Sequence, residues 1–293
     1  MNIFYLKTLS WEKDFFMNDI FNQSFYTSKI NVYMFDKYIT PTMLNKYNKD
    51  KNILITNCNI PINLLNDILR ILRPKTVFHL SDEFGNDHLY YKLYDMYNIY
   101  TFHQYNHNKI NYHKHHYQIP LGYVTGFLNN TNIPNKKTKD FSFIGSLKSD
   151  RNIMVDNFKQ VFPNNFIYTG ETNWCNLNKL SILPTDLFEI YSKSVFVPIG
   201  RGNKSLDCFR FYETILAGAV PVVVGNMKEI NETFHYSNIR PIIISGDTWE
   251  EASIKCKSLI ESKTHLKNIT EYNKDWYKYH IDIIINKIKE ITK

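Results

Sequence analysis

The sequence has few cysteines and no hydrophobic run long enough to cross a membrane. Its 293 residues include four cysteines, and no two of them form a CxxC pair. They are Cys58, Cys175, Cys208 and Cys256. This spacing argues against a structural zinc site and a disulfide framework, and it fits a reducing compartment. The N-terminus also lacks the apolar segment of a secretion signal. We therefore expect a protein without a membrane span that is located in the cytoplasm. If the gene is viral, this would be the cytoplasm of the host cell.

Signatures of nucleic-acid binding are missing as well. The formal net charge is +7, but the lysines are scattered along the chain. A basic surface suits an anionic ligand, which could be nucleic acid, a phosphorylated metabolite or a membrane surface. No RNA-recognition motif, zinc finger or arginine-rich arm is present. We therefore expect no nucleic-acid partner.

Short apolar runs that close on a glycine recur in the second half and alternate with segments of helical periodicity. The runs are Phe141–Gly145, Phe166–Gly170, Val195–Gly200, Val220–Gly225 and Ile242–Gly246. The first 125 residues carry another set of strand candidates: Ile3–Leu6, Ile30–Phe35, Ile53–Thr56, Val77–Leu80, Tyr100–His103 and Tyr117–Leu121. Buried strands alternating with helices predict parallel sheets covered on both faces. The fold class is therefore α/β.

A polar stretch divides the chain into two predicted domains. It covers residues 129–139 and resembles a linker. We predict a first domain at residues 1–128 and a second at residues 129–270. Residues 271–293 contain a helical pattern and are predicted to form a helix that packs back on the first domain.

The segment Val195–Asn226 reads as a strand, a glycine-containing loop, a helix and a second strand. The loop spans residues 200–205, Asp207 is a candidate helix cap, and Gly218 is expected to end the helix. Such a unit attracts phosphate, because the free N–H groups and the dipole of the helix both favour an anion.

Arg210 and Glu213 share one face of this helix because they lie three residues apart. A guanidinium for the pyrophosphate and a carboxylate for the ribose hydroxyls suit a nucleotide-sugar site. The alternative is a surface Arg–Glu pair, but the loop and both strands favour the site. Lys148 and Arg151 open the preceding helix as a second phosphate clamp, or as exposed charge. The donor-binding candidates are Gly145, Ser146, Lys148, Arg151, Gly200, Arg201, Gly202, Ser205, Arg210 and Glu213.

Two adjacent carboxylates follow a predicted strand of the first domain. Asp82 and Glu83 could supply a general base, or they could cap a helix or form a turn. We name both as catalytic candidates, because the base of a two-domain transferase usually comes from the domain opposite the nucleotide. Gly122 and Tyr123 precede the linker. They either line the acceptor side of the cleft or turn the chain at the domain boundary.

The sequence offers no convincing metal site. Histidines gather at positions 103, 107, 113, 115 and 116, but their spacing matches no metal-binding pattern. No DxD-type carboxylate pair follows a strand in the second half. Stabilisation of the leaving group would then fall to Arg201, Arg210 and the helix dipole. We predict metal-independent chemistry with no cofactor.

The motifs of residues 76–226 resemble those of exostosin-type glycosyltransferases, family 47. They are Phe143-Ile144-Gly145 with Arg151, Pro198–Gly202, Ser205, Arg210-Phe211, Glu213, Gly218 and Pro221–Val224, with weaker matches at His79–Glu83 and Pro120–Tyr123. The resemblance implies a GT-B fold of two facing Rossmann-like domains with a cleft between them. It also implies inversion at the anomeric carbon. The loop is longer here than in the animal enzymes, so the equivalence of Arg201 is open.

We expect a hexosyl- or pentosyltransferase of glycan biosynthesis. Its donor would be a nucleoside-diphosphate sugar, a UDP-sugar in preference to a GDP-sugar, and its acceptor a glycan, a glycoprotein or another hydroxyl compound. Two alternatives stay open: a fucosyltransferase-like GT-B enzyme, and a degenerate transferase that only binds a glycan or a nucleotide.

Overall fold

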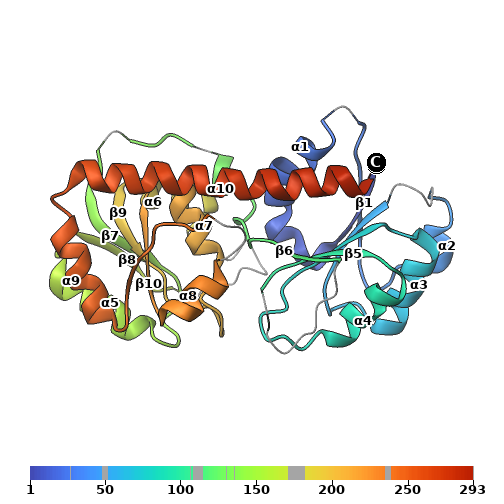
Figure 1. The fold of residues 1–293 in the computed structure, drawn as a ribbon, viewed down its shortest axis with the longest axis horizontal. Helices are drawn as coiled ribbons and strands as arrows, with labels where there is room; N and C mark the ends of the chain where they lie inside the picture. The colour runs from blue at the N-terminus through green and yellow to red at the C-terminus, as the bar shows by residue number, and fades with distance from the viewer. Residues whose placement is uncertain are drawn as a thin grey trace. The chain divides into compact units, whose positions relative to one another are not determined.

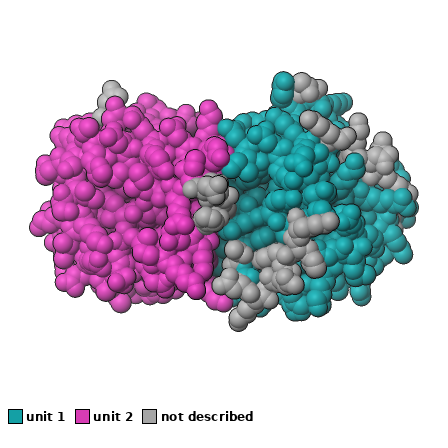
Figure 2. Space-filling model, in the orientation of Figure 1, with its two compact units in different colours: residues 1–120, 281–293 teal, residues 121–280 magenta. Residues whose placement is uncertain are grey.

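The computed structural model describes residues 1–26, 28–47, 52–105, 107, 115–129, 131–134, 136–170, 182–234 and 239–292. The chain forms two compact units, shown in Figure 2. Unit 1 consists of residues 1–120 and 281–293, and unit 2 consists of residues 121–280.

Unit 1 contains a six-stranded sheet in the order β2-β1-β3-β4-β5-β6. All neighbouring strands are parallel. The strands are β1 (Asn2–Leu6), β2 (Asn31–Phe35), β3 (Asn52–Thr56), β4 (Thr76–His79), β5 (Tyr100–His103) and β6 (His116–Gln118). All five residues of β3 are buried, as expected for an inner strand of a sheet covered on both faces.

The helices of unit 1 lie in the chain between its strands. They are η1 (Lys7–Glu12), the π-helix η2 (Phe15–Phe21), α1 (Asn22–Ser24), α2 (Pro41–Leu44), α3 (Ile62–Leu72) and α4 (His88–Met96). The buried stripe of α3 is Leu65, Ile68, Leu69 and Leu72, which is the spacing of an amphipathic helix. The helix ends where Arg73 adopts a left-handed conformation.

Unit 2 contains a five-stranded parallel sheet in the order β11-β10-β9-β7-β8. The strands are β7 (Lys139–Ile144), β8 (Asn165–Tyr168), β9 (Ser194–Pro198), β10 (Val220–Val224) and β11 (Ile244–Gly246). The helices are η3 (Phe127–Asn129), α5 (Arg151–Val161), α6 (Pro184–Ser192), α7 (Phe209–Leu216), α8 (Met227–Thr233), α9 (Trp249–Leu259) and α10 (Lys263–Thr292), and they lie on both sides of the sheet (Figure 1).

Aromatic rings fill the core between this sheet and helices α5 and α9. Phe141, Phe158 and Phe196 are fully buried, and Phe162 and Trp249 nearly so. The ring centroids of Phe141 and Phe158 are 5.2 Å apart, and those of Phe162 and Phe196 are 5.8 Å apart. These contacts fix α5 against β7 and so hold the start of α5 beside the end of that strand.

The predicted boundaries at residues 128 and 270 differ from the limits of the compact units. The division falls after residue 120 because the next residues pack inside unit 2. Val124 donates its N–H to Glu213 at 3.3 Å, and the ring of Phe127 packs on Phe188 at 5.2 Å. Helix α10, the long red helix of Figure 1, contributes residues up to 280 to unit 2 and the remainder to unit 1. Across the described ranges, no helix combines the length and apolar character that a membrane span requires.

Candidate functional site

The carboxyl ends of β7 and β9 lie at the point where the strand order of unit 2 reverses. Strand β7 has β8 on one side and β9 on the other. Ligands of open parallel sheets bind at such a switch point, beyond the carboxyl ends of the strands. Gly145 follows β7, Gly200 follows β9, and α7 begins after the next loop. The sequence-predicted donor residues gather at this edge of the sheet.

Arg210 lies in the first turn of α7 and turns toward the end of β7. Its side chain is buried, and Nη2 donates to the carbonyl oxygen of Ile144 at 3.0 Å. The guanidinium lies 5.4 Å from the ring centroid of Phe143. Gly145 leaves room for it, because a Cβ at that position would lie 2.7 Å from Nη2, and its φ of +152° also disfavours a side chain. A glycine at position 145 is therefore needed for Arg210 to occupy this position.

Arg151 opens α5 and approaches the same place from the other side. Nη1 donates to the carbonyl oxygen of Ser146 at 3.1 Å, and Nη2 donates to that of Arg201 at 2.5 Å. Only 5% of the residue is exposed, and its buried Nε has no partner. Burial, followed by the neighbouring charge of Arg210, lowers the pKa of Arg151 to about 10. The side chain is still a cation at neutral pH.

These two guanidiniums are held by backbone carbonyls and not by carboxylates. In the described ranges, neither Arg151 nor Arg210 has a carboxylate oxygen within 4.0 Å. Two buried positive charges therefore lie close together, and the carboxylates of Glu213 and Asp150 act on them electrostatically without ion-pair contact. An anion that contacts both guanidiniums would be favourable here. A diphosphate has the charge and the oxygen acceptors that such a pair needs.

Glu213 is buried one turn after Arg210. Its Oε1 accepts the N–H of Val124 at 3.3 Å. Burial raises the pKa of Glu213 to about 7, although this hydrogen bond and Arg210 both lower it. The carboxyl group can accept hydrogen bonds from ribose hydroxyls when it is ionised.

Arg201 differs from the other two arginines because it is already paired. Its Nη1 and Nη2 donate to the two carboxylate oxygens of Glu229 at 2.5 and 2.8 Å. Its backbone N–H donates to Asp150, whose other oxygen accepts from the indole of Trp249. The geometry therefore gives Arg201 the role of holding the loop after β9 in place.

The remaining donor candidates shape this loop. The N–H of Gly202 donates to the carbonyl oxygen of Ser205 at 2.9 Å, and Nζ of Lys148 donates to Oδ1 of Asn203 at 2.5 Å. A Cβ at Gly200 would lie 2.5 Å from Cγ of Arg151, so the backbone passes directly against that side chain. The loop thus keeps its position relative to both arginines.

The expectation that Asp207 caps α7 is wrong. The N-cap is Cys208, a free thiol that makes no capping hydrogen bond. Asp207 instead accepts the hydroxyl of Tyr212 at 2.8 Å, and its N–H donates to Oγ of Ser205. The N-cap side chain leaves the start of α7 uncapped, and the N–H of Phe211 donates to the carbonyl oxygen of Cys208 at 3.0 Å.

In unit 1, Asp82 and Glu83 begin the turn that leads from β4 to α4. Both are buried. Asp82 accepts the N–H of Asn86 at 2.9 Å and that of Asp87 at 3.4 Å, and its carbonyl oxygen is 2.6 Å from Nε2 of His107. Burial and then the Asp87 charge raise the pKa of Asp82. Asp82 therefore stabilises the turn, and the catalytic role of either acid stays a prediction.

Three histidines of unit 1 surround the ring of Tyr91. The ring centroid of Tyr91 is 5.0 Å from that of His79, 5.8 Å from His103 and 5.7 Å from His116. Nε2 of His79 lies 2.7 Å from Asp87, and its Nδ1 lies 2.9 Å from the Tyr94 hydroxyl. These histidines therefore belong to a buried structural cluster.

Within the part of the chain that the structure describes, no three His, Cys, Asp or Glu side chains are placed to hold a metal ion. His113 and Cys175 lie outside the described residues. Metal-independent chemistry stays a prediction.

Because the histidine cluster is buried, we expect the folded protein to lose stability at acidic pH. Burial lowers the pKa of His103 from 6.5 to about 3, so only the unfolded chain binds this proton between these values. Stability should fall as pH decreases below 6.5, by about 1.4 kcal/mol per pH unit from this group. Melting temperatures from pH 7 to pH 4 should decline less steeply for His103→Asn than for the wild type. The exposed His265→Asn should keep the wild-type slope, and equal slopes for all three proteins would contradict the assignment.

Gly122 and Tyr123 belong to unit 2. Tyr123 is buried, and its ring lies 6.2 Å from that of Phe127. Gly122 has a φ of +75° and turns the chain where unit 2 begins. Their part in acceptor binding stays a prediction.

Glu12 is a buried acid that sequence reasoning did not single out. It ends η1, accepts the indole N–H of Trp11 at 3.0 Å and accepts the side-chain amide of Gln104. Burial raises the pKa of Glu12 to about 8. Its surroundings in the sequence carry no motif, and its partner lies 92 positions away, so no local pattern could have indicated it.

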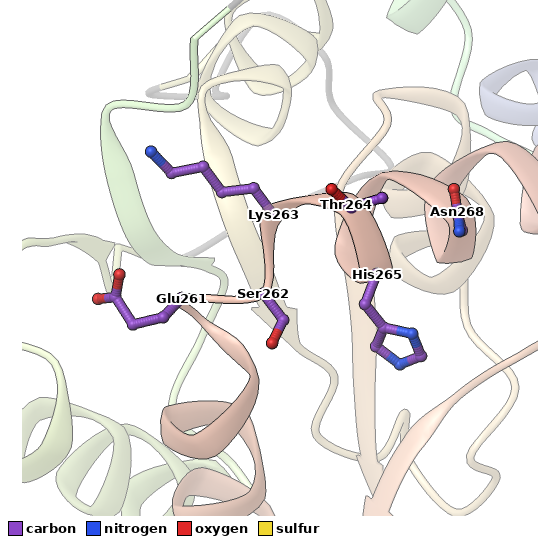
Figure 3. A pocket seen from close by; sticks show the side chains of 6 residues that line it. All are labelled: Glu261, Ser262, Lys263, Thr264, His265 and Asn268. Carbon is purple, nitrogen blue, oxygen red and sulfur yellow. The ribbon is translucent and has the colours of Figure 1, made fainter.

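Two surface hollows of unit 2 involve none of the donor candidates. One lies along α8 and has a volume of about 230 Å³. The other lies where α9 passes into α10, and Figure 3 shows its side chains pointing in different directions. It is lined by Glu261, Ser262, Lys263, Thr264, His265 and Asn268. Without converging side chains, this hollow is a poorer candidate than the arginine pair.

No profile of a known protein family matches the chain, and no curated protein matches it. Among solved structures, the chain is similar to HepE of Anabaena, crystallised in complex with UDP and glucose. The TM-score is 0.64, the sequence identity is 12%, and the match covers 99% of this chain and 98% of HepE. At this identity the similarity shows the fold alone. It confirms the predicted α/β class with two Rossmann-like domains, the GT-B fold.

Proposed function

We propose that the protein is a glycosyltransferase that transfers a sugar from a nucleoside-diphosphate sugar to a hydroxyl acceptor. The observation that carries the proposal is the pair of buried guanidiniums at the switch point of unit 2. Arg151 and Arg210 lack close carboxylates in the described ranges, and Nε of Arg151 has no partner. The similarity to HepE, which was crystallised with UDP and glucose, supports a UDP-sugar as the donor.

The donor would bind with its diphosphate on these two arginines and on the uncapped N-terminus of α7. Glu213 would accept the ribose hydroxyls. Arg201 would hold the loop, because Glu229 already occupies its guanidinium. The exostosin-like relationship, a glycan or glycoprotein acceptor and the hexosyl or pentosyl nature of the sugar are parts of the same proposal.

The transfer would proceed by direct displacement. The acceptor oxygen forms a bond to the anomeric carbon while the bond to the diphosphate breaks, and the electron pair leaves with the diphosphate. Attack from the opposite face inverts the anomeric centre. The proton of the acceptor hydroxyl would pass to Asp82 or Glu83 of unit 1. The two guanidiniums would stabilise the charge that develops on the leaving group.

A panel of UDP- and GDP-sugars tests the proposal. We expect at least one donor to raise the melting temperature and to release free nucleotide, slowly by hydrolysis when no acceptor is present. Turnover should survive EDTA within about a few-fold, because the arginines supply the positive charge. Binding without any release would favour the degenerate binder, and preference for GDP-fucose would favour the fucosyltransferase-like enzyme. Complete loss on chelation with recovery on Mn²⁺ would overturn metal independence.

A further inference from the structure

A chain of hydrogen bonds joins the segment after β1 to the turn after β4. Glu12 accepts the amide Nε2–H of Gln104, and Oε1 of Gln104 accepts the N–H of Ser81 at 2.9 Å. Because a backbone N–H can only donate, the amide oxygen must face Ser81 and the amide nitrogen must face Glu12. The orientation of Gln104 is therefore determined.

Ser81 needs this support because its backbone is strained. Its φ is +68°, in the left-handed region that costs a residue with a Cβ about 1–2 kcal/mol. Asp82 and Glu83, the candidate bases, follow it directly. A hydrogen bond to the N–H of Ser81 therefore helps to fix the direction in which this acidic pair leaves the sheet.

Glu12 is a buried acidic residue. It is 1% exposed, and no ion pair to it is found among the described residues. The donors Trp11 and Gln104 stabilise its ionised form against the effect of burial. Burying an acidic group without an ion pair lowers stability, so a function would explain why this position carries one.

The segment after Glu12 adds a second, independent observation. Residues Phe15–Phe21 form a π-helix, a rare conformation that is concentrated at functional sites. The rings of Phe16 and Phe21 lie 5.5 and 5.3 Å from that of Phe78 in β4. The π-helix therefore anchors the Glu12 segment to the same strand that carries the acidic turn.

We propose that Glu12 and Gln104 are positioning residues that hold the turn from Ser81 to Glu83 in the geometry needed for proton transfer. The inference rests on the proposed glycosyl transfer. It assigns these two residues a role that acts on the acidic turn and not directly on the donor or the acceptor. Their effect passes through Ser81.

Gln104→Met and Glu12→Gln test this role. Each removes or weakens the bond to Ser81 while keeping the size of the side chain. We expect kcat to fall on the order of 10-fold in each variant, while the Kd for UDP stays within about 2-fold, because UDP binds to unit 2. We also expect the Ser81 amide to exchange with solvent about 10-fold faster in Gln104→Met, the effect of losing about 1.4 kcal/mol of local stability.

Ser81→Gly separates positioning from a general loss of structure. Glycine adopts a φ of +68° without strain, so it should restore part of kcat when combined with Gln104→Met. Unchanged kcat in both single variants, or kcat and UDP affinity falling together without recovery by Ser81→Gly, would overturn the proposal. Failure of the proposed function would show differently, as no turnover by the wild type. In that case the exchange rate still decides whether Gln104 holds Ser81, and an unchanged rate overturns that step.

Discussion

Replacing Arg210 with methionine should weaken the binding of UDP by roughly 1.5–3 kcal/mol, about 10- to 150-fold in Kd. The guanidinium is buried beside a second cation, so its loss removes a charge-assisted hydrogen bond to the diphosphate. Methionine keeps most of the packing on Phe143. Lysine should not restore affinity, because an ammonium cannot reproduce the planar fork that reaches both Ile144 and a phosphate. Calorimetric titration with UDP and with pyrophosphate measures the effect.

Arg201→Met is the matched control. Arg201 is paired with Glu229, so we expect its loss to change UDP affinity by less than about 1 kcal/mol. Gly145→Ala tests the same assignment in a second way, because the added Cβ would displace Nη2 of Arg210 without removing the charge. We expect it to weaken UDP binding as well. Equal losses for Arg201→Met and Arg210→Met, or wild-type affinity in Arg210→Met and Gly145→Ala, would refute the arginine-pair assignment.

Glu83→Gln should lower kcat on the order of 10²–10⁴, which is the usual contribution of a positioned general base. Asp82→Asn should behave differently, because both oxygens of Asp82 accept N–H groups of the turn. We expect it to lose about 1 kcal/mol of unfolding free energy in addition to any effect on kcat. Steady-state kinetics with saturating donor, together with thermal unfolding, separates the two effects.

The UDP affinity of both variants serves as the control and should stay near that of the wild type. A folded Asp82→Asn that loses kcat while Glu83→Gln keeps it would identify Asp82 as the base. If both variants keep kcat, the two acids are structural. The buried histidines would then be poor substitutes, since burial holds the pKa of His103 near 3 and His79 is enclosed by Tyr94 and Asp87.

Sequence patterns predicted the regular elements well where the apolar spacing was strict. The predicted strand Tyr100–His103 has the same bounds in the structure. The helix predicted within residues 271–293 is instead part of the longer α10, which begins at Lys263. Its first turns carry mostly polar residues, so periodicity gave no signal there. The π-helix was not predicted, because its run of aromatic residues fits no single period.

In the candidate site, too, features set by neighbouring residues could be predicted, and contacts between residues far apart in the chain could not. Arg210 and Arg151 could be found because each follows a glycine-terminated strand. The structure distinguishes them from Arg201 by its greater exposure and by its ion pair with Glu229, which lies 28 positions further along the chain. Asp207 was expected to cap α7, but a hydroxyl from the next turn, that of Tyr212, competes for its carboxylate. Such contacts between distant or competing partners have no signature in one sequence.

The division of the chain between the units has a consequence for its synthesis on the ribosome. Residues 121–280 are contiguous, so unit 2 can complete its sheet as soon as they have emerged. Unit 1 emerges first, but it also includes the end of α10, where Ile281, Ile285 and Ile288 are buried and Lys287 lies 5.2 Å from the ring of Tyr117. The domain that is translated first is therefore the last to be finished. Until residues 281–292 have emerged, the apolar surface of unit 1 that they cover stays exposed to solvent.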